Sequence, residues 1–160
     1  MLFRSLDALA AFIRRLADKR TAATRVELVI NGDFVDFLAH DHGDNGRWQA
    51  FAYEKGAALA AFEAIARGVD KPVFDALGEF VETCRLTVML GNHDLELSLP
   101  EVREAFLARL GDGATRNVRF QYDGEALEVG DAIIEHGNAQ DPANAVDFNG
   151  LRSEERRVGK

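Results

Sequence analysis

The sequence predicts an α/β domain, because runs typical of buried strands alternate with runs typical of amphipathic helices. Residues 26–31 and 86–90 are mostly apolar and have the length of strands. Residues 132–135 form a third, shorter run that is apolar until its last position. Most of the intervening stretches place apolar residues three and four positions apart, which is the spacing of a helix that packs on a sheet.

The N-terminal stretch, residues 1–20, predicts an amphipathic helix. Its apolar stripe consists of Leu2, Leu6, Leu9, Ile13 and Leu16. Charged residues are scattered through the stretch, which excludes a secretory signal and a transmembrane span. Acidic residues also interrupt its basic face, so packing on a sheet is a better interpretation than binding to a membrane surface.

Residues 37–48 follow the first strand and predict a polar loop beside its end. This loop carries His40 and His42. We expect a solvated loop or contacts with substrate, and metal ligation by these histidines is the alternative. Three aromatic residues come next, and they either pack in the core or cover the mouth of a site: Trp48, Phe51 and Tyr53.

The middle of the chain predicts three helices, at residues 53–67, 70–84 and 100–110. Asp70 has the right residue type to cap the second helix, with Pro72 in its first turn. Cys84 is interpreted as a small buried residue on a helix face rather than a reactive thiol.

Two short strands are predicted after the last helix, at residues 117–121 and 126–129. Asp123 and Gly124 lie between them, and this dipeptide predicts that the two strands form a hairpin. Gly130 and Asp131 then turn the chain into the strand at 132–135.

Polar side chains follow three of the predicted strands at the point where each strand ends. Asp33 follows the first, Asn92, His93 and Asp94 follow the second, and His136 follows the last. In open α/β sheets, ligands sit outside the carboxyl ends of the strands. A carboxylate, an amide oxygen and imidazole rings suit a metal site or an acid–base site. We therefore expect one shared site.

Each of these residues also has a purely structural interpretation. Asp33 would cap a turn, Asn92 would occupy a left-handed turn position, and His136 would be a hydrogen-bonded histidine at a strand end. Other polar residues nearby are expected to support loops without binding metal: Asp36, Asn138 and Asp141.

The motifs GDFVD at 32–36, GNHD at 91–94 and EHGN at 135–138, in this order, resemble the central motifs of the calcineurin-like metallophosphoesterases. The resemblance covers residues 26–141 and implies an α/β fold with a metallophosphoesterase-like β-sandwich flanked by helices. The family pattern also has an earlier Asp-x-His motif and a later Gly-His-x-His motif, and this sequence has neither. We therefore expect residues 1–150 to be a fragment of such a domain, incomplete at both ends.

The resemblance also implies a role for each site residue. Asp33 would bridge two metal ions, and Asn92 and His136 would bind one of them. His93 would be the catalytic residue that faces the phosphoester, and Asp94 would hydrogen-bond its ring and assist it. Mixed nitrogen and oxygen ligands leave Mn²⁺, Fe, Zn²⁺ and Mg²⁺ open. Because two motifs are missing, we expect at most one metal ion per chain.

Composition narrows the function classes. The 160-residue chain has a net charge of −8 and a pI near 5.0, which argues against non-specific binding to nucleic acid or anionic membrane. A phosphoester substrate stays possible, because a bound metal ion supplies local positive charge. Cys84 is the only cysteine, so no internal disulfide forms, and a reducing, cytoplasmic location is expected.

The last residues, 151–160, are highly charged and break the pattern of the preceding domain. Two interpretations stay open: a solvated tail, or a foreign end joined to a truncated reading frame.

The predicted function is that of a metal-dependent phosphoester hydrolase whose activity in this chain is weak or absent. The substrate is not predicted beyond its phosphoester group. The alternative is a non-catalytic remnant of the same fold that acts as a binding or interaction module. A nucleic-acid-binding module fits poorly, because the chain is acidic and has no basic stripe.

Overall fold

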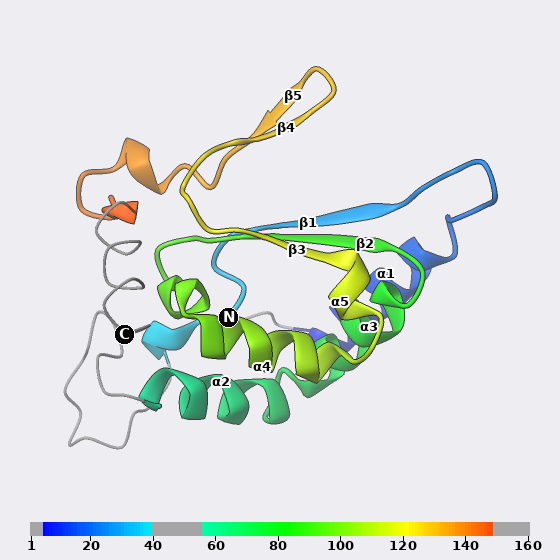
Figure 1. The fold of residues 1–160 in the computed structure, drawn as a ribbon, viewed down its shortest axis with the longest axis horizontal. Helices are drawn as coiled ribbons and strands as arrows, with labels where there is room; N and C mark the ends of the chain where they lie inside the picture. Colours follow the sequence, from blue (N-terminus) through cyan, green and yellow to red (C-terminus); the bar gives the residue numbers. More distant parts are fainter. Residues whose placement is uncertain (1–4, 40–55, 149–160) are drawn as a thin grey trace.

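The computed structural model describes residues 5–39 and 56–148, and its centre is a parallel sheet of three strands (Figure 1). The strands lie in the order β1 (Glu27–Asn31), β2 (Arg85–Met89) and β3 (Val118–Gln121). Ile30 pairs with Val88, and Val88 pairs with Phe120. Because the strands are parallel, their carboxyl ends lie at the same edge of the sheet.

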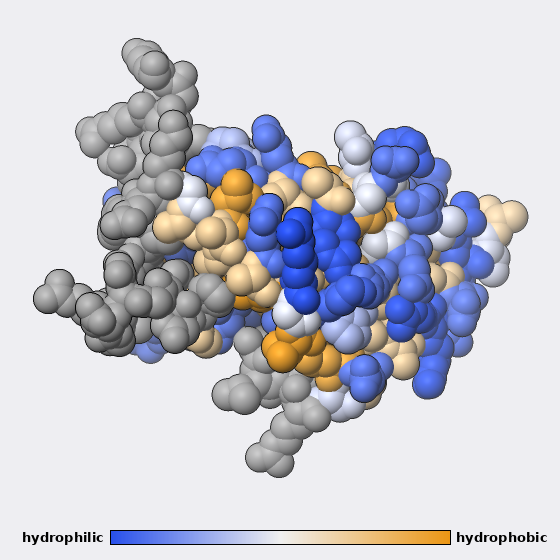
Figure 2. Space-filling model, turned by 90° about the horizontal axis from the view of Figure 1, so that it is seen from below, coloured by the Kyte–Doolittle hydropathy of each residue, from blue (hydrophilic) through white to orange (hydrophobic). Residues whose placement is uncertain are grey.

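Helices cover one face of this sheet, the lower face in Figure 1. They are α1 (Leu6–Ala17), α2 (Ala57–Arg67), α3 (Lys71–Val81), α4 (Pro100–Leu110) and the short α5 (Ala114–Asn117). Helix α1 packs mainly against α3, and α2 packs against α4. Figure 2 shows this side of the molecule from below, with a broad hydrophilic band between smaller hydrophobic patches. The helices therefore turn much of their polar surface to solvent and their apolar stripes to the sheet.

Phenylalanine rings form the centre of the core between helices and sheet. Phe106 of α4 lies 5.7 Å from Phe74 of α3 and 5.4 Å from Phe120 of β3, measured between ring centroids. Phe34, which directly follows Asp33, lies 5.4 Å from Phe74. Tilted and edge-to-face contacts of this kind add to the free energy gained by burial. The core therefore anchors the loop that carries Asp33.

The strands β4 (Leu127–Val129) and β5 (Ala132–Ile134) form an antiparallel hairpin that points away from the parallel sheet (Figure 1). The prediction that 117–121 and 126–129 pair with each other is therefore wrong. Residues 118–121 pair with β2 instead, because Phe120 packs into the phenylalanine core from that position. The tight turn of the real hairpin is the two-residue loop of Gly130 and Asp131.

The structure confirms the α/β class but not the finer fold prediction. In the described ranges, the strands form one three-stranded parallel sheet and one hairpin. These two sheets do not show a metallophosphoesterase-like sandwich flanked by helices. No helix in the described part of the chain is long and apolar enough to cross a membrane.

The local predictions differ in how well they agree with the structure. The predicted helix at 100–110 has the bounds of α4. Asp70 stands before α3, but its side chain caps no amide, because its backbone is already helical, at φ −83° and ψ −4°. Cys84 is buried as predicted, although it follows α3 rather than lying on its face.

Candidate metal centre

Two tight turns bring the ends of β1 and β2 into contact. Gly32 has a φ of 77° and Asp33 a φ of 53°, and Asp33 is the only non-glycine residue with a positive φ in the described ranges. A Cβ atom on Gly32 would lie 2.8 Å from the Cα atom of Gly91, and one on Gly91 would lie 2.6 Å from the Asp33 nitrogen. Neither position has room for a side chain, so the glycine pair allows the two turns to touch.

Asp33, Asn92 and His136 converge at these turns. The Nε2 atom of His136 lies 3.3 Å from Oδ2 of Asp33 and 3.4 Å from Oδ1 of Asn92. Oδ1 of Asp33 accepts a hydrogen bond of 2.9 Å from the backbone nitrogen of His93. The structure thus brings the three predicted ligands together. His136 arrives from the β4–β5 hairpin, however, and not from a strand of the parallel sheet.

The second ring nitrogen of His136 fixes the orientation of the ring. Its Nδ1 atom lies 2.7 Å from the backbone oxygen of Asn31, and a carbonyl oxygen only accepts, so Nδ1–H is the donor. The side chain of Asn31 in turn donates to the backbone oxygen of Glu135 at 2.9 Å. These two bonds fasten the chain before His136 to the end of β1. They leave Nε2 facing Asp33 and Asn92.

The ring of His93 has Asp36 as its carboxylate partner. Nδ1 of His93 lies 3.1 Å from Oδ1 of Asp36, which also accepts a 3.1 Å hydrogen bond from the backbone nitrogen of Ala39. Burial alone raises the pKa of Asp36, but the hydrogen bonds from His93 and Ala39 outweigh it and bring the pKa below its ordinary value. The side chain of His93 is 40% exposed, so its ring remains open to a ligand.

Asp94 does not hold the His93 ring, so that part of the prediction is wrong. Its side chain is fully buried, and its two carboxylate oxygens accept hydrogen bonds from the backbone nitrogens of Gly91, at 2.6 Å, and Phe34, at 2.9 Å. Burial raises the pKa of Asp94 to about 6, against the opposing effect of these hydrogen bonds. Asp94 thus ties the two turns together. Both of its carboxylate oxygens accept backbone hydrogen bonds, and Asp36 contacts His93 instead.

The chemistry of the converging atoms fits a divalent cation. The three converging atoms are all electron-pair donors: Oδ2 of Asp33, Oδ1 of Asn92 and Nε2 of a neutral His136. A cation between them, or a second proton on His136, would remove the repulsion between their lone pairs. A histidine whose other nitrogen donates to a carbonyl is a common arrangement in metal sites. In the described part of the chain, no three His, Cys, Asp or Glu side chains gather closely enough to hold a metal ion. Here the third donor is an amide oxygen.

The purely structural interpretations of the polar residues agree with the structure in some cases and not in others. Asn92 does not take a left-handed conformation, because in the described ranges only Asp33 does so among non-glycine residues. Asn138 and Asp141 make hydrogen bonds within their own loop, as predicted: Asn138 to the Asn144 oxygen, and Asp141 to Ala143 and Asn144. Several predicted residues lie outside the described residues: His40, His42, Trp48, Phe51 and Tyr53.

Two residues of the site are missing from the sequence-based assignment of roles. The sequence predicts only that Asp36 supports its loop and that Asn31 is the last residue of a strand. The spacing of Asp36, three residues after Asp33, was a usable signal, because one turn of chain returns a side chain to the same region. Nothing in the sequence marks Asn31, because its contacts to His136 and Glu135 join residues more than one hundred positions apart.

Comparisons with models of protein families, with curated proteins and with solved structures found no match to this chain. The resemblance to the metallophosphoesterases therefore rests on the three sequence motifs alone.

Proposed function

We propose that this chain carries a metal-dependent phosphoester hydrolase site of low activity. The observation that supports the proposal most is the convergence of Asp33, Asn92 and His136 next to the His93–Asp36 pair. The first three residues offer ligands for one divalent cation, and the pair offers a proton donor at the same edge of the sheet.

Asp33, Asn92 and His136 would hold the ion. When bound, such an ion binds phosphate oxygens and makes water a better nucleophile at neutral pH. Asp33 is the only charged member of this ligand set, so the site would keep a net positive charge that attracts a phosphoester. Oδ1 of Asp33 accepts the hydrogen bond from the backbone nitrogen of His93, so Oδ2 is the oxygen that faces His136.

His93 would act on the leaving group. Attack of a water-derived hydroxide forms a new P–O bond while the ester P–O bond breaks, and the departing alkoxide takes the proton from His93. The 3.1 Å contact between Oδ1 of Asp36 and Nδ1 of His93 holds the ring in place for this transfer. The products are the free alcohol and phosphate, and the proton of the attacking water is finally returned to His93.

The alternative function, a non-catalytic binding module, is favoured by one observation. The converging set has a single carboxylate, and one carboxylate with two neutral ligands holds a divalent ion less tightly than several carboxylates do. A module of this kind would bind a metal ion or a phosphoester without turning it over.

The deciding experiment measures hydrolysis of bis(4-nitrophenyl) phosphate by the full chain with and without Mn²⁺. We expect slow release of nitrophenol that depends on Mn²⁺. The His93→Ala variant should retain Mn²⁺ but lose turnover by about a hundredfold, or to the level of the buffer, since proton transfer is typically worth that much.

The matched controls separate the two functions. Asp33→Asn should lose both Mn²⁺ and turnover, whereas Asp112→Asn, which changes an exposed aspartate outside the site, should lose neither. Release by wild type no faster than by Asp33→Asn, with Mn²⁺ still bound to wild type, would refute hydrolysis and favour the binding module. Loss of Mn²⁺ from His93→Ala would make His93 a ligand.

A further inference from the structure

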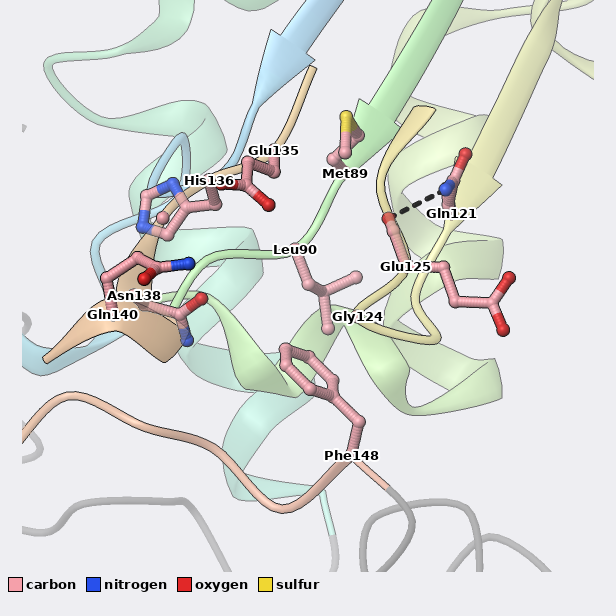
Figure 3. Close-up of a pocket in the computed structure, with 11 residues that line it drawn as sticks. Met89, Leu90, Gln121, Gly124, Glu125, Glu135, His136, Asn138, Gln140 and Phe148 are labelled. Carbon is pink, nitrogen blue, oxygen red and sulfur yellow. Dashed lines mark hydrogen bonds between the residues drawn. The ribbon is translucent and has the colours of Figure 1, made fainter. Parts of the chain in front are cut away.

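A pocket adjoins the candidate metal centre. It is small, with a cavity volume of about 40 Å³, opens to solvent, and lies between the ends of β2 and β3 and the chain that follows β5 (Figure 3). His136 belongs to both places, because it lines this pocket and directs Nε2 at Asp33 and Asn92. A group bonded to a phosphate in the centre would therefore lie beside this pocket.

The centre of the pocket is apolar. Figure 3 shows Leu90 and Phe148 in the middle, with Gln121 on one side and His136, Asn138 and Gln140 on the other. Phe148 packs on Gly124 so closely that a Cβ atom there would lie 2.7 Å from its Cε2 atom. A side chain at 124 would push the ring out of place, so this close approach sets the position of the apolar wall.

The polar rim of the pocket is rich in acceptors. The amide nitrogen of Gln121 already donates to the Glu125 oxygen at 2.8 Å, and that of Asn138 donates to the Asn144 oxygen at 3.2 Å. The carboxylate of Glu135 adds negative charge, whereas that of Glu125 points away from the pocket (Figure 3), and no Lys or Arg is among the described residues that line the pocket. An anionic group placed here would lose its water and meet like charge without a cationic partner.

We infer that this pocket receives the alcohol part of the phosphoester, and that it accepts an apolar alcohol that is uncharged or positively charged and rejects one that carries a second anionic group. The inference rests on the proposed function, because it takes the metal centre as the place of the phosphate. It assigns selectivity to Glu135, Leu90 and Phe148, none of which belongs to the metal ligands.

Binding can be measured without any metal, because the chain has only two methionines, Met1 and Met89, and Met89 lines the pocket. Full-length protein labelled with ¹³C at the methionine methyl groups is titrated with three probes of one shape: benzyl alcohol, benzylammonium and benzoate. We expect the Met89 signal to shift saturably with the first two, while the Met1 signal stays in place. Benzoate should bind about tenfold more weakly or not at all, because its charge finds no partner.

Two variants assign the preference to residues. Glu135→Gln should weaken the binding of benzylammonium and strengthen the binding of benzoate. Glu104→Gln changes an exposed glutamate on α4 and should leave the binding of both probes unchanged. Phe148→Ala should weaken the binding of all three probes. The control, Phe12→Ala, changes a phenylalanine that is 53% exposed and should leave their binding unchanged. If Phe148→Ala does not fold, Glu135→Gln still decides the matter. Equal binding of all probes to wild type, or an unmoved Met89 signal, would overturn the inference.

Hydrolysis separates this inference from the proposed function. With Mn²⁺, the kcat/KM for benzyl phosphate should exceed that for 4-carboxybenzyl phosphate by about tenfold, in line with the cost of an unpaired charge. Equal values would overturn the selectivity while leaving the hydrolase proposal intact. A shifting Met89 signal without hydrolysis of either ester would overturn the hydrolase proposal, and with it the assignment of the pocket to the alcohol.

Discussion

At the scale of single residues, the candidate site depends on which carboxylate serves which partner. Asp33, Asp36 and Asp94 belong to the same two motifs, but among them only Asp36 contacts the ring of His93. Asp33 faces His136, and Asp94 accepts only backbone hydrogen bonds in the contacts given above. Three side chains of one chemical type therefore have three different tasks.

Asp36→Asn should lower turnover about ten- to one hundredfold while leaving Mn²⁺ binding unchanged. The amide keeps the shape of the carboxylate but not its charge, so its hydrogen bond to the His93 ring is weaker, and partners of this kind typically have effects of this size. The measurements are Mn²⁺ content and the pH profile of kcat, whose alkaline side should shift to lower pH, because the variant lacks the negative charge beside the proton donor His93. An unshifted profile with a reduced rate would indicate that Asp36 only supports its loop.

Asp94 should make the folded protein less stable as the pH rises from about 4 to about 7. The pKa of Asp94 is raised from 3.8 to about 6 in the folded state, so the folded state binds more protons than the unfolded state in this window. The stabilising effect is complete below the unfolded pKa and is lost as the pH rises through the folded pKa. Two pKa units correspond to roughly 3 kcal/mol.

Urea unfolding of wild type and Asp94→Asn, without metal and at several pH values, tests this expectation. The asparagine does not titrate, so the free energy of unfolding of wild type minus that of the variant should fall by roughly 3 kcal/mol between pH 4 and pH 7. Other titrating groups cancel in this difference, including Asp36, whose pKa is lowered. Parallel curves for the two proteins would contradict the prediction.

At the scale of elements, the contact between the turns after β1 and β2 decides whether the ligands can meet. The strands are neighbours in the sheet, and the turns touch through Gly32 and Gly91. The two turns are held by bonds in both directions, from His93 to Asp33 and from Phe34 to Asp94. The site therefore depends on backbone contact as much as on its side chains.

Gly91→Ala should abolish metal binding and lower the melting temperature, because the new methyl group would overlap the Asp33 carboxylate. Overpacking of this kind typically costs about 1–3 kcal/mol. The control is Gly111→Ala after α4, where φ is 91° and no atom lies within 4 Å of the added carbon. That variant should lose some stability through backbone strain but keep its Mn²⁺. Normal metal binding by Gly91→Ala would show that the turns can separate without cost.

At the scale of the whole molecule, the phenylalanine core connects the helices to the site. Phe34 packs against Phe74 and Phe106, while its backbone nitrogen donates to Asp94 beside the metal ligands. A cation that binds the folded site and not the unfolded chain must therefore stabilise the entire fold.

Elemental analysis after dialysis against Mn²⁺ should find at most one ion per chain, removed by mild chelation. Saturating Mn²⁺ should raise the melting temperature of wild type and of Asp112→Asn but not that of Asp33→Asn, which lacks the only charged ligand. Two ions per chain with clear turnover would contradict this prediction. That outcome would indicate that His40 or His42 supplies the missing ligands.

Much of the local structure could be predicted from the sequence alone. The strands at 27–31 and 85–89, the helix at 100–110 and the polar residues after each strand follow from apolar runs, proline and glycine positions. The gathering of Asp33 and Asn92 also follows, because parallel neighbouring strands end at one edge. These features depend on residues close in sequence or on a general property of sheets.

Only the tertiary structure decided the pairing of β3, the carboxylate partner of His93 and the orientation of His136. Each of these depends on contacts between residues that are far apart in the sequence. The strand at 118–121 pairs with β2 rather than with its sequence neighbour, since the core buries Phe120 there. Asp36 rather than the adjacent Asp94 serves His93, since the buried Asp94 is held by two backbone amides. The orientation of His136 depends on Asn31, and a contact across 105 positions leaves no periodic pattern in the sequence.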